Sequence, residues 1–226
     1  MRLSIILPAL LFIALQTAKP PRQYRITGFA QGTTYHITYY TADSLLSQTE
    51  VETVLAGLDS SLSLYKPYSL INAFNNSKEA FIIDTHLQNV VRKSLQVYAT
   101  TNGAFDITVW PLVNAWGFGV QKINTVPTKA MIDSLMPCIG SNKLSLQGNI
   151  LHKQLPCVQL DVNGIAQGYS VDVLAALLES KGITNYLVEI GGEIRLKGRK
   201  QPGNEKMKIG IESPAEAFAA PQIKKI

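Results

Sequence analysis

Three stretches of the chain alternate apolar and polar side chains around a glycine turn, the pattern of an antiparallel β-hairpin. They are YRITGFAQGTTYHITYY (24–40, turning near Gly32), KLSLQGNILHK (143–153, turning at Gly148 and Asn149) and NYLVEIGGEIRLKG (185–198, turning at Gly191 and Gly192). MKIGIES, residues 207–213, continues the alternation after the last of them and predicts one more strand.

Other stretches repeat their apolar residues at helical spacing between capping and stop residues. They are Ser44 to Leu64, a short helix capped by Ser69, Asp84 to Tyr98 ending before Asn102 and Gly103, residues 128–136, and a long helix after Asp161 that stops at Lys181 and Gly182. Hairpins mixed with helices predict an α+β fold with mixed or antiparallel sheets and flanking helices. A doubly wound parallel sheet is disfavoured, because strands and helices do not alternate regularly.

Composition is that of one globular domain with a substantial core: 226 residues, 46% hydrophobic and 16% charged. The formal net charge is +5, and the basic residues are scattered along the sequence apart from a pair near the end. A scattered distribution is typical of a solvated surface, so no nucleic-acid partner is expected.

The first residues, MRLSIILPALLFIALQTAKP, place one positive charge at Arg2 before an apolar run from Leu3 to Leu15. This order is typical of a secretory signal, so residues 1–18 are expected to direct export to the periplasm. The run is short for a membrane span, yet an uncleaved anchor in the inner membrane is the second interpretation and a buried core segment the third. No cysteine is present there to carry a lipid.

Cys138 and Cys157 are the only cysteines. In an exported protein they can form a disulfide, but two separate buried thiols fit the sequence equally well. The three histidines, His36, His86 and His152, lack the spacing of a zinc site. Neither a phosphate-binding G-x-x-x-x-G-K-[ST] loop nor a complete dinucleotide fingerprint is present.

LDVNGIAQGYSVD, residues 160–172, contains more turn-forming residues than the start of a helix requires. One explanation is conformational, because Asn and Gly tolerate positive φ. The other is that a helix start poor in side chains lets backbone groups meet a phosphate or a metal.

Further unusual blocks precede this stretch. QGTTYHITYY has a glycine inside a strand pattern, SLSLYKPYSLINAFN presents Tyr65 beside a proline turn, and TNGAFDITVWPLVNAWGFG follows a helix stop. An exposed tyrosine at such a turn can stack on a flat ring.

In this order and spacing the blocks resemble the ApbE family, the FAD:protein FMN transferases. The matching segments are Gln31-Gly32-Thr33, Ser63 to Tyr65 with Ser69 to Asn75, Gly103 to Thr108 with Trp116 to Phe118, Asp161 to Asp172, and Gly191 to Glu193. The resemblance implies an FAD-binding catalytic domain over residues 24–214, followed by a short tail, 215–226.

The resemblance also implies site residues. FAD would be contacted by Gln31, Tyr65, Ala104, Phe105, Asp106, Asp161 and Gln167. The carbonyl oxygen of Gly164 would bind Mg²⁺, a hard cation that accepts backbone oxygens and phosphates. The family commonly has Met where this chain has Gln31 and Lys where it has Gln167, so a positive charge near the phosphates is missing. No catalytic side chain is assigned.

The family's His-x-x-Asp-Pro-x-x-Gly and Ala-Asp-Ala-x-x-Thr blocks, which supply an Asp and a Thr to the metal, are not found before Ile226. The resemblance implies an exported, Mg²⁺-dependent transferase that moves FMN from FAD to a threonine of a target flavoprotein. Without those blocks, transfer by these residues alone is expected to be negligible. The alternatives are a truncated, non-catalytic FAD-binding protein and a surface interaction protein that binds no nucleotide.

Overall fold

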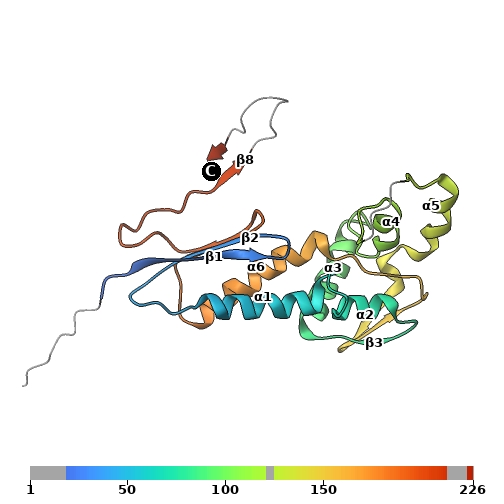
Figure 1. The fold of residues 1–226 in the computed structure, drawn as a ribbon, viewed down its shortest axis with the longest axis horizontal. Helices are drawn as coiled ribbons and strands as arrows, with labels where there is room; N and C mark the ends of the chain where they lie inside the picture. The colour runs from blue at the N-terminus through green and yellow to red at the C-terminus, as the bar shows by residue number, and fades with distance from the viewer. Residues whose placement is uncertain (1–18, 121–124, 213–222, 226) are drawn as a thin grey trace, which may run out of the picture.

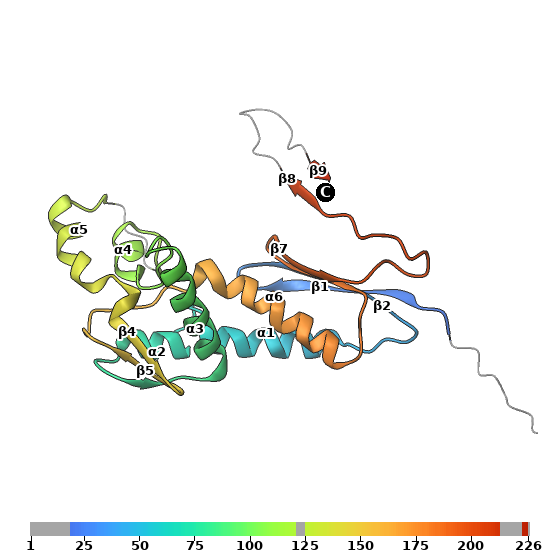
Figure 2. The same cartoon turned by 180° about the vertical axis from the view of Figure 1, so that it is seen from behind.

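A four-stranded antiparallel sheet forms one half of the protein. The computed structural model describes residues 19–120, 125–212 and 223–225. The strands are β1 (Arg22–Ala30), β2 (Thr33–Thr41), β6 (Tyr186–Ile190) and β7 (Glu193–Lys197), in the order β1-β2-β6-β7. Two long helices, α1 (Gln48–Leu62) and α6 (Asn163–Ser180), run along one face of this sheet (Figures 1 and 2).

The first hairpin follows directly from its sequence. Ala30 pairs with Thr33, so the turn consists of Gln31 and Gly32, both with positive φ (53° and 78°), as the tight hairpin turn requires. Alternate residues of β2, Tyr35, Ile37 and Tyr39, are fully buried against the helices. Period-two alternation therefore gives the sheet its one apolar face.

Capping residues set the ends of the helices. Ser47 and Glu50 form a capping box at the start of α1. Asp84 caps α3 (Thr85–Thr100), and the Ser61 hydroxyl of α1 donates to the same carboxylate at 2.8 Å. One acidic side chain thus starts α3 and fastens it to α1.

The other half of the protein surrounds a smaller sheet, in the order β3 (Phe81–Ile82), β5 (Ile150–Lys153), β4 (Leu144–Gln147). The remaining helices of this half are α2 (Leu70–Asn76), α4 (Trp110–Ala115) and α5 (Lys129–Leu135), with 3₁₀ turns at Met136–Cys138 and Ser141–Lys143. Strands β8 (Gly210–Glu212) and β9 (Ile223–Lys225) form a separate pair that stands apart from the large sheet (Figure 1).

The predicted α+β class is confirmed, and all three hairpins and the long helices form where periodicity placed them. The strand predicted over residues 207–213 is wrong in its start, because within the described residues 207–212 only 210–212 pair, and they pair with β9 instead of extending the β6–β7 hairpin; residue 213 lies outside the described residues. Strand β9 falls in the expected tail. Helix α4 and strand β3 were not predicted, since six and two residues are too short for a periodic signal.

A disulfide joins Cys138 to Cys157, so the two cysteines are not separate buried thiols. The expected signal segment, residues 1–18, lies outside the described residues. Among the helices that the structure describes, none has the length and apolarity to cross a bilayer.

Candidate functional site

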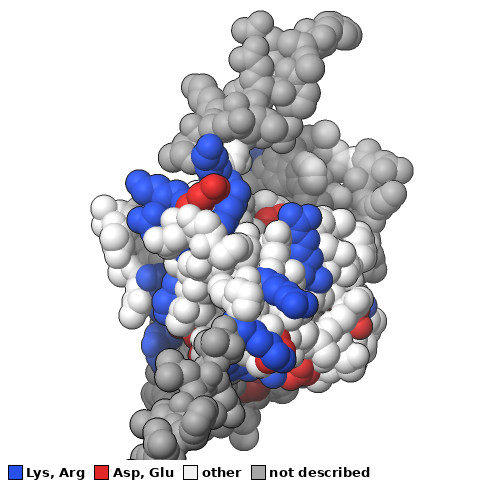
Figure 3. Space-filling view, turned by 90° about the vertical axis from the view of Figure 1, so that its left-hand side faces the viewer, with Lys and Arg blue, Asp and Glu red and all other residues white. Residues whose placement is uncertain are grey.

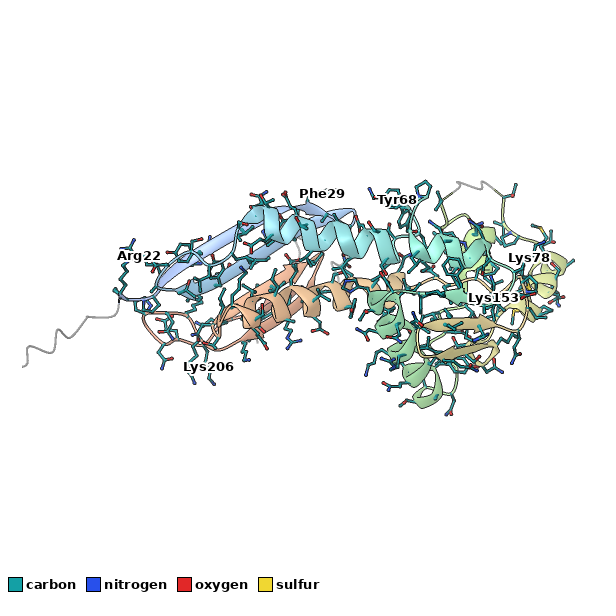
Figure 4. All side chains as sticks on the ribbon, turned by 90° about the horizontal axis from the view of Figure 1, so that it is seen from below. Arg22, Phe29, Tyr68, Lys78, Lys153 and Lys206 are labelled. Carbon is teal, nitrogen blue, oxygen red and sulfur yellow. A yellow bond between two sulfur atoms is a disulfide. The ribbon has the colours of Figure 1, made fainter. Side chains whose placement is uncertain are left out.

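A cavity of about 770 Å³ lies between the large sheet and its helices. It is bordered by the turn of the first hairpin, by one side of α1, by the segment that leaves α1, and by the first two turns of α6. This volume is within the usual range for small-molecule and cofactor sites. Figure 4 shows Phe29, a cavity residue, and Tyr68 on the same side of the molecule along α1.

Three of the predicted FAD contacts, Gln31, Tyr65 and Gln167, line this one cavity although they are far apart in the sequence. Tyr65 is 58% exposed, so the face of its ring is available to a ligand. The side-chain amide of Gln31 donates to the hydroxyl of Ser170 at 2.8 Å, which fastens the hairpin turn to α6. Gln31 thus lines the cavity from a turn that α6 holds in place.

Gln167 lies against the turn of the β6–β7 hairpin, at Gly191. A Cβ added to Gly191 would be 2.5 Å from Nε2 of Gln167 and 2.8 Å from Cγ2 of Thr33. Gly191 also has a φ of +54°, which side chains rarely adopt. The glycine therefore gives Gln167 room to reach the cavity, and it explains one glycine of the Gly-Gly pair.

The predicted residues Phe105, Asp161 and Gly164 meet at the N-terminus of α6. A Cβ on Gly164 would lie 3.6 Å from the Phe105 ring. The Asp161 N–H donates to the carbonyl of Ile107 at 2.7 Å, and the Asn163 N–H donates to the Asp161 carboxylate at 2.9 Å. Burial raises the pKa of Asp161, against the lowering effect of the Asn163 N–H. Asn163 also lines the cavity, so this cluster adjoins it.

The conformational explanation for the glycines at the start of α6 is wrong. Helix α6 begins at Asn163, and none of Asn163, Gly164 and Gly168 has positive φ. The N-cap residue, Val162, makes no side-chain cap bond, but the Asp161 carboxylate accepts from the N–H of Asn163, and the Val162 carbonyl accepts from those of Ile165 and Ala166. Among the first four N–H groups of α6, that of Gly164 is the one with no partner in the described part of the chain, and a free N–H at a helix start favours an anionic group such as a phosphate.

Asp106 has a different environment from the other predicted contacts. Its Oδ1 accepts from the N–H and hydroxyl of Thr108 and from the hydroxyl of Ser141, and its Oδ2 accepts from the Ser141 N–H. Because the carboxylate is occupied by these donors, any FAD contact of Asp106 falls to its backbone. Ala104 is exposed, and its N–H donates to the carbonyl of Thr101.

The segment that leads to Asp161, residues 158–160, is held by buried polar groups. Asn75 accepts from the N–H of Leu160 at 2.7 Å and donates to its carbonyl at 3.0 Å. The ammonium group of Lys153 donates to the carbonyls of Phe74, Asn75 and Val158. Burial lowers the pKa of Lys153. Figure 4 shows this residue in the half of the protein that surrounds the smaller sheet. The motif residue Asn75 thus positions this segment and is not part of the cavity wall.

Sequence reasoning missed the acidic side of the cavity. Glu52 and Asp59 of α1 line it together with Lys66. Burial raises the pKa of Asp59, and the nearby Lys66 opposes this. The signal was present in the sequence, since Asp59 directly follows the buried Leu58 and therefore lies at the edge of the apolar stripe of its helix.

The described residues offer few ligands for a metal ion. No group of three His, Cys, Asp or Glu side chains among them is placed to hold one. Gly164 offers its carbonyl oxygen, and its neighbours in the sequence, Asp161 and Asn163, carry side-chain oxygens. Mg²⁺ requires near-octahedral oxygen coordination, so these residues do not form a complete Mg²⁺ site by themselves.

Comparison with known proteins identifies the family. The family model described as "ApbE family" matches residues 31–226. The chain belongs to the ApbE family. The FAD:protein FMN transferase of Vibrio cholerae serotype O1 is 39% identical over 222 residues, which cover 95% of this chain and 66% of that relative. The FAD:protein FMN transferase of Haemophilus influenzae is 35% identical, covering 87% and 60%.

Solved ApbE structures have the same fold. The flavin transferase ApbE from Vibrio cholerae superposes with a TM-score of 0.83 at 36% identity, covering 91% of this chain and 68% of that one. The apo form of the Pseudomonas stutzeri flavinyl transferase ApbE gives a TM-score of 0.80 at 34% identity, covering 85% and 66%. The chain spans 60% to 66% of the length of the two curated relatives.

Proposed function

We propose that this ApbE-family protein binds FAD in the cavity and transfers its FMN part to a threonine of a target flavoprotein. The observation that carries the proposal is the convergence of Gln31, Tyr65 and Gln167 on one cavity beside the N-terminus of α6. The relatives named FAD:protein FMN transferase support it.

The cavity suits the parts of FAD. The exposed ring of Tyr65 is available for stacking on a flat heterocycle. The diphosphate would lie at the first turn of α6, where the N–H of Gly164 and the helix dipole favour negative charge. Gln167 provides an amide donor for a phosphate oxygen, a weaker contact than a lysine would make. In this pose Phe105 and Asp161 support the helix start that the diphosphate meets.

The reaction is a phosphoryl transfer. The threonine hydroxyl oxygen forms a bond to the phosphorus on the FMN side of FAD and gives up its proton to water, the bond from that phosphorus to the bridging oxygen breaks, and AMP leaves. In such reactions, positioning and charge stabilisation supply most of the rate enhancement. The chain contributes binding and orientation through the cavity, and no side chain among the described residues is assigned as the base.

Dependence on Mg²⁺ is part of the proposal, with the carbonyl of Gly164 as one ligand. When bound, Mg²⁺ neutralises charge that develops on the phosphates. Since the described residues do not complete a site for it, no step is assigned through the metal. Export to the periplasm, with the N-terminal segment as signal or inner-membrane anchor, is likewise proposed from the sequence. The disulfide supports this, because disulfides persist in oxidising compartments.

Two measurements test the proposal. Titration of FAD into the protein, followed by flavin fluorescence, should show saturable binding that weakens in Tyr65→Ala. Mass spectrometry of a threonine-bearing acceptor should show an added FMN. Binding without transfer would point to the non-catalytic FAD-binding alternative, and absence of binding would point to an interaction protein and refute the proposal.

A further inference from the structure

Basic residues from opposite ends of the sequence meet at one end of the large sheet. Arg22, the first residue of β1, pairs with Thr41, and Lys197, the last residue of β7, pairs with Tyr186, which itself pairs with Tyr39. Antiparallel register therefore brings the beginning of β1 and the end of β7 to the same end. Figure 4 shows Arg22 and Lys206 together at this end.

Six exposed side chains define this surface, which we call the basic end. They are Arg22, Arg25, Arg199, Lys200, Lys206 and Lys208. Figure 3 looks at this end of the molecule and shows Lys and Arg side chains spread across it, with fewer acidic ones. Scattered positions in the sequence thus become a cluster in the fold.

The charge of the basic end is not neutralised by neighbouring carboxylates. Within the described residues, none of the six forms an ion pair, whereas the nearby Asp43 pairs with Lys19 and Glu179 with Arg195 and Lys197. Glu205 is the one acidic residue between Arg199 and Lys208. Unpaired, exposed cations of this density attract a polyanionic surface.

The sequence indicates which polyanion is near. The apolar run ends at Leu15, seven residues before Arg22. Seven residues reach at most about 25 Å even when fully extended. Whatever path they take, a bilayer that holds the apolar run lies within that distance of the start of β1, and the basic end surrounds that start.

We propose that the basic end binds the anionic headgroups of phospholipids at the membrane surface. The inference goes beyond flavin transfer and rests on the membrane association proposed above. It fixes an orientation as well. Phe29 at the cavity lies seven residues along β1 from Arg22, so the cavity is held roughly 24 Å from the lipid-facing end, at about 3.4 Å per residue.

The expected effect is large enough to measure. A Lys or Arg near an anionic membrane strengthens binding by about fivefold, equivalent to about 1 kcal/mol. Four charges removed together should therefore weaken binding to anionic vesicles by well over tenfold. Because salt screens exposed charges, the effect should disappear at about 1 M salt, where the Debye length is about 3 Å.

The test measures binding of the full chain to phosphatidylcholine vesicles with and without phosphatidylglycerol. The ratio of the two binding constants removes the contribution of the apolar segment, which binds both. The basic-end variant carries Arg199→Gln, Lys200→Gln, Lys206→Gln and Lys208→Gln. The matched control carries Lys78→Gln, Arg92→Gln, Lys93→Gln and Lys129→Gln, which remove the same charge from the other half of the protein; Figure 4 shows Lys78 at the opposite end from Arg22 and Lys206.

We expect the wild type and the control to prefer phosphatidylglycerol vesicles at least tenfold at low salt, and the basic-end variant to lose most of that preference. Equal losses in both variants, or no preference in the wild type, would overturn the proposal. Loss of DNA binding in the basic-end variant, without a lipid preference in the wild type, would assign the surface to nucleic acid instead. Both variants should bind FAD like the wild type. Failure of the wild type to bind FAD would count against the proposed function and leave this inference standing.

Discussion

Replacing Asn75 with alanine should destabilise the protein and weaken FAD binding together. The side chain exchanges two hydrogen bonds with the backbone of Leu160, which is fully buried. Each bond contributes about 0.5–1.5 kcal/mol, and a buried backbone group left without a partner costs about 1–3 kcal/mol. Because the truncated side chain leaves space for partial relaxation, we expect the free energy of unfolding to fall by about 2–4 kcal/mol.

Urea unfolding followed by circular dichroism measures this directly. With a slope of about 2 kcal/mol per molar urea, the midpoint should move down by roughly 1–2 M. Asn76→Ala is the matched control, since Asn76 is the next residue of α2 and is exposed. The urea midpoint of this control should stay close to that of the wild type. FAD affinity should fall in the folded Asn75 variant, because Leu160 directly precedes Asp161. Equal midpoints for the two variants would refute the view that Asn75 holds the segment before Asp161.

Three further outcomes are expected. Gly191→Ala should reduce FAD affinity by displacing Gln167, whereas Gly192→Ala, which is also strained by positive φ but has open space around it, should reduce it less; flavin fluorescence titration decides. Reducing the disulfide of Cys138, which closes a loop with a sequence separation of 19, should lower the free energy of unfolding by about 3 kcal/mol in denaturant. Hydrogen bonds to the Glu50 carboxylate, chiefly from the Lys181 ammonium and then from Ser47, lower the pKa of Glu50 from 4.5 to about 2. The stabilisation that ionised Glu50 contributes is therefore present above pH 4.5 and lost as the pH falls toward 2. The difference in thermal midpoint between wild type and Glu50→Gln should shrink to zero over that range, and a constant difference would contradict it.

Local patterns were sufficient for most elements of the fold. Alternation around Gly32 and Gly191 predicted hairpins, and Ser69 and Asp84 marked helix starts that the structure confirms. These features depend on neighbours in the sequence, where capping and turn chemistry act. The separate pairing of β8 with β9 could not be predicted this way, because strand partners are chosen by tertiary contacts.

The site was predicted in part. Family motifs pointed to Gln31 and Gln167, but only the fold shows that they line one cavity, since Gln31 is fastened to Ser170 across 139 residues. The spacing of the cysteines left two interpretations open because it carries no information on distance in space. The basic end was missed for the same reason, as its residues gather only through the register of the sheet. Explaining Gly164 by positive φ failed because the helix already begins at Asn163.

A crystal structure of the protein with bound FAD would test the central claim most directly. The account predicts FAD in the cavity lined by Gln31, Tyr65 and Gln167, with its diphosphate at the first turn of α6 and a ring against Tyr65. FAD bound elsewhere, on the open face of the large sheet or in the half that contains α3 and α5, would contradict it.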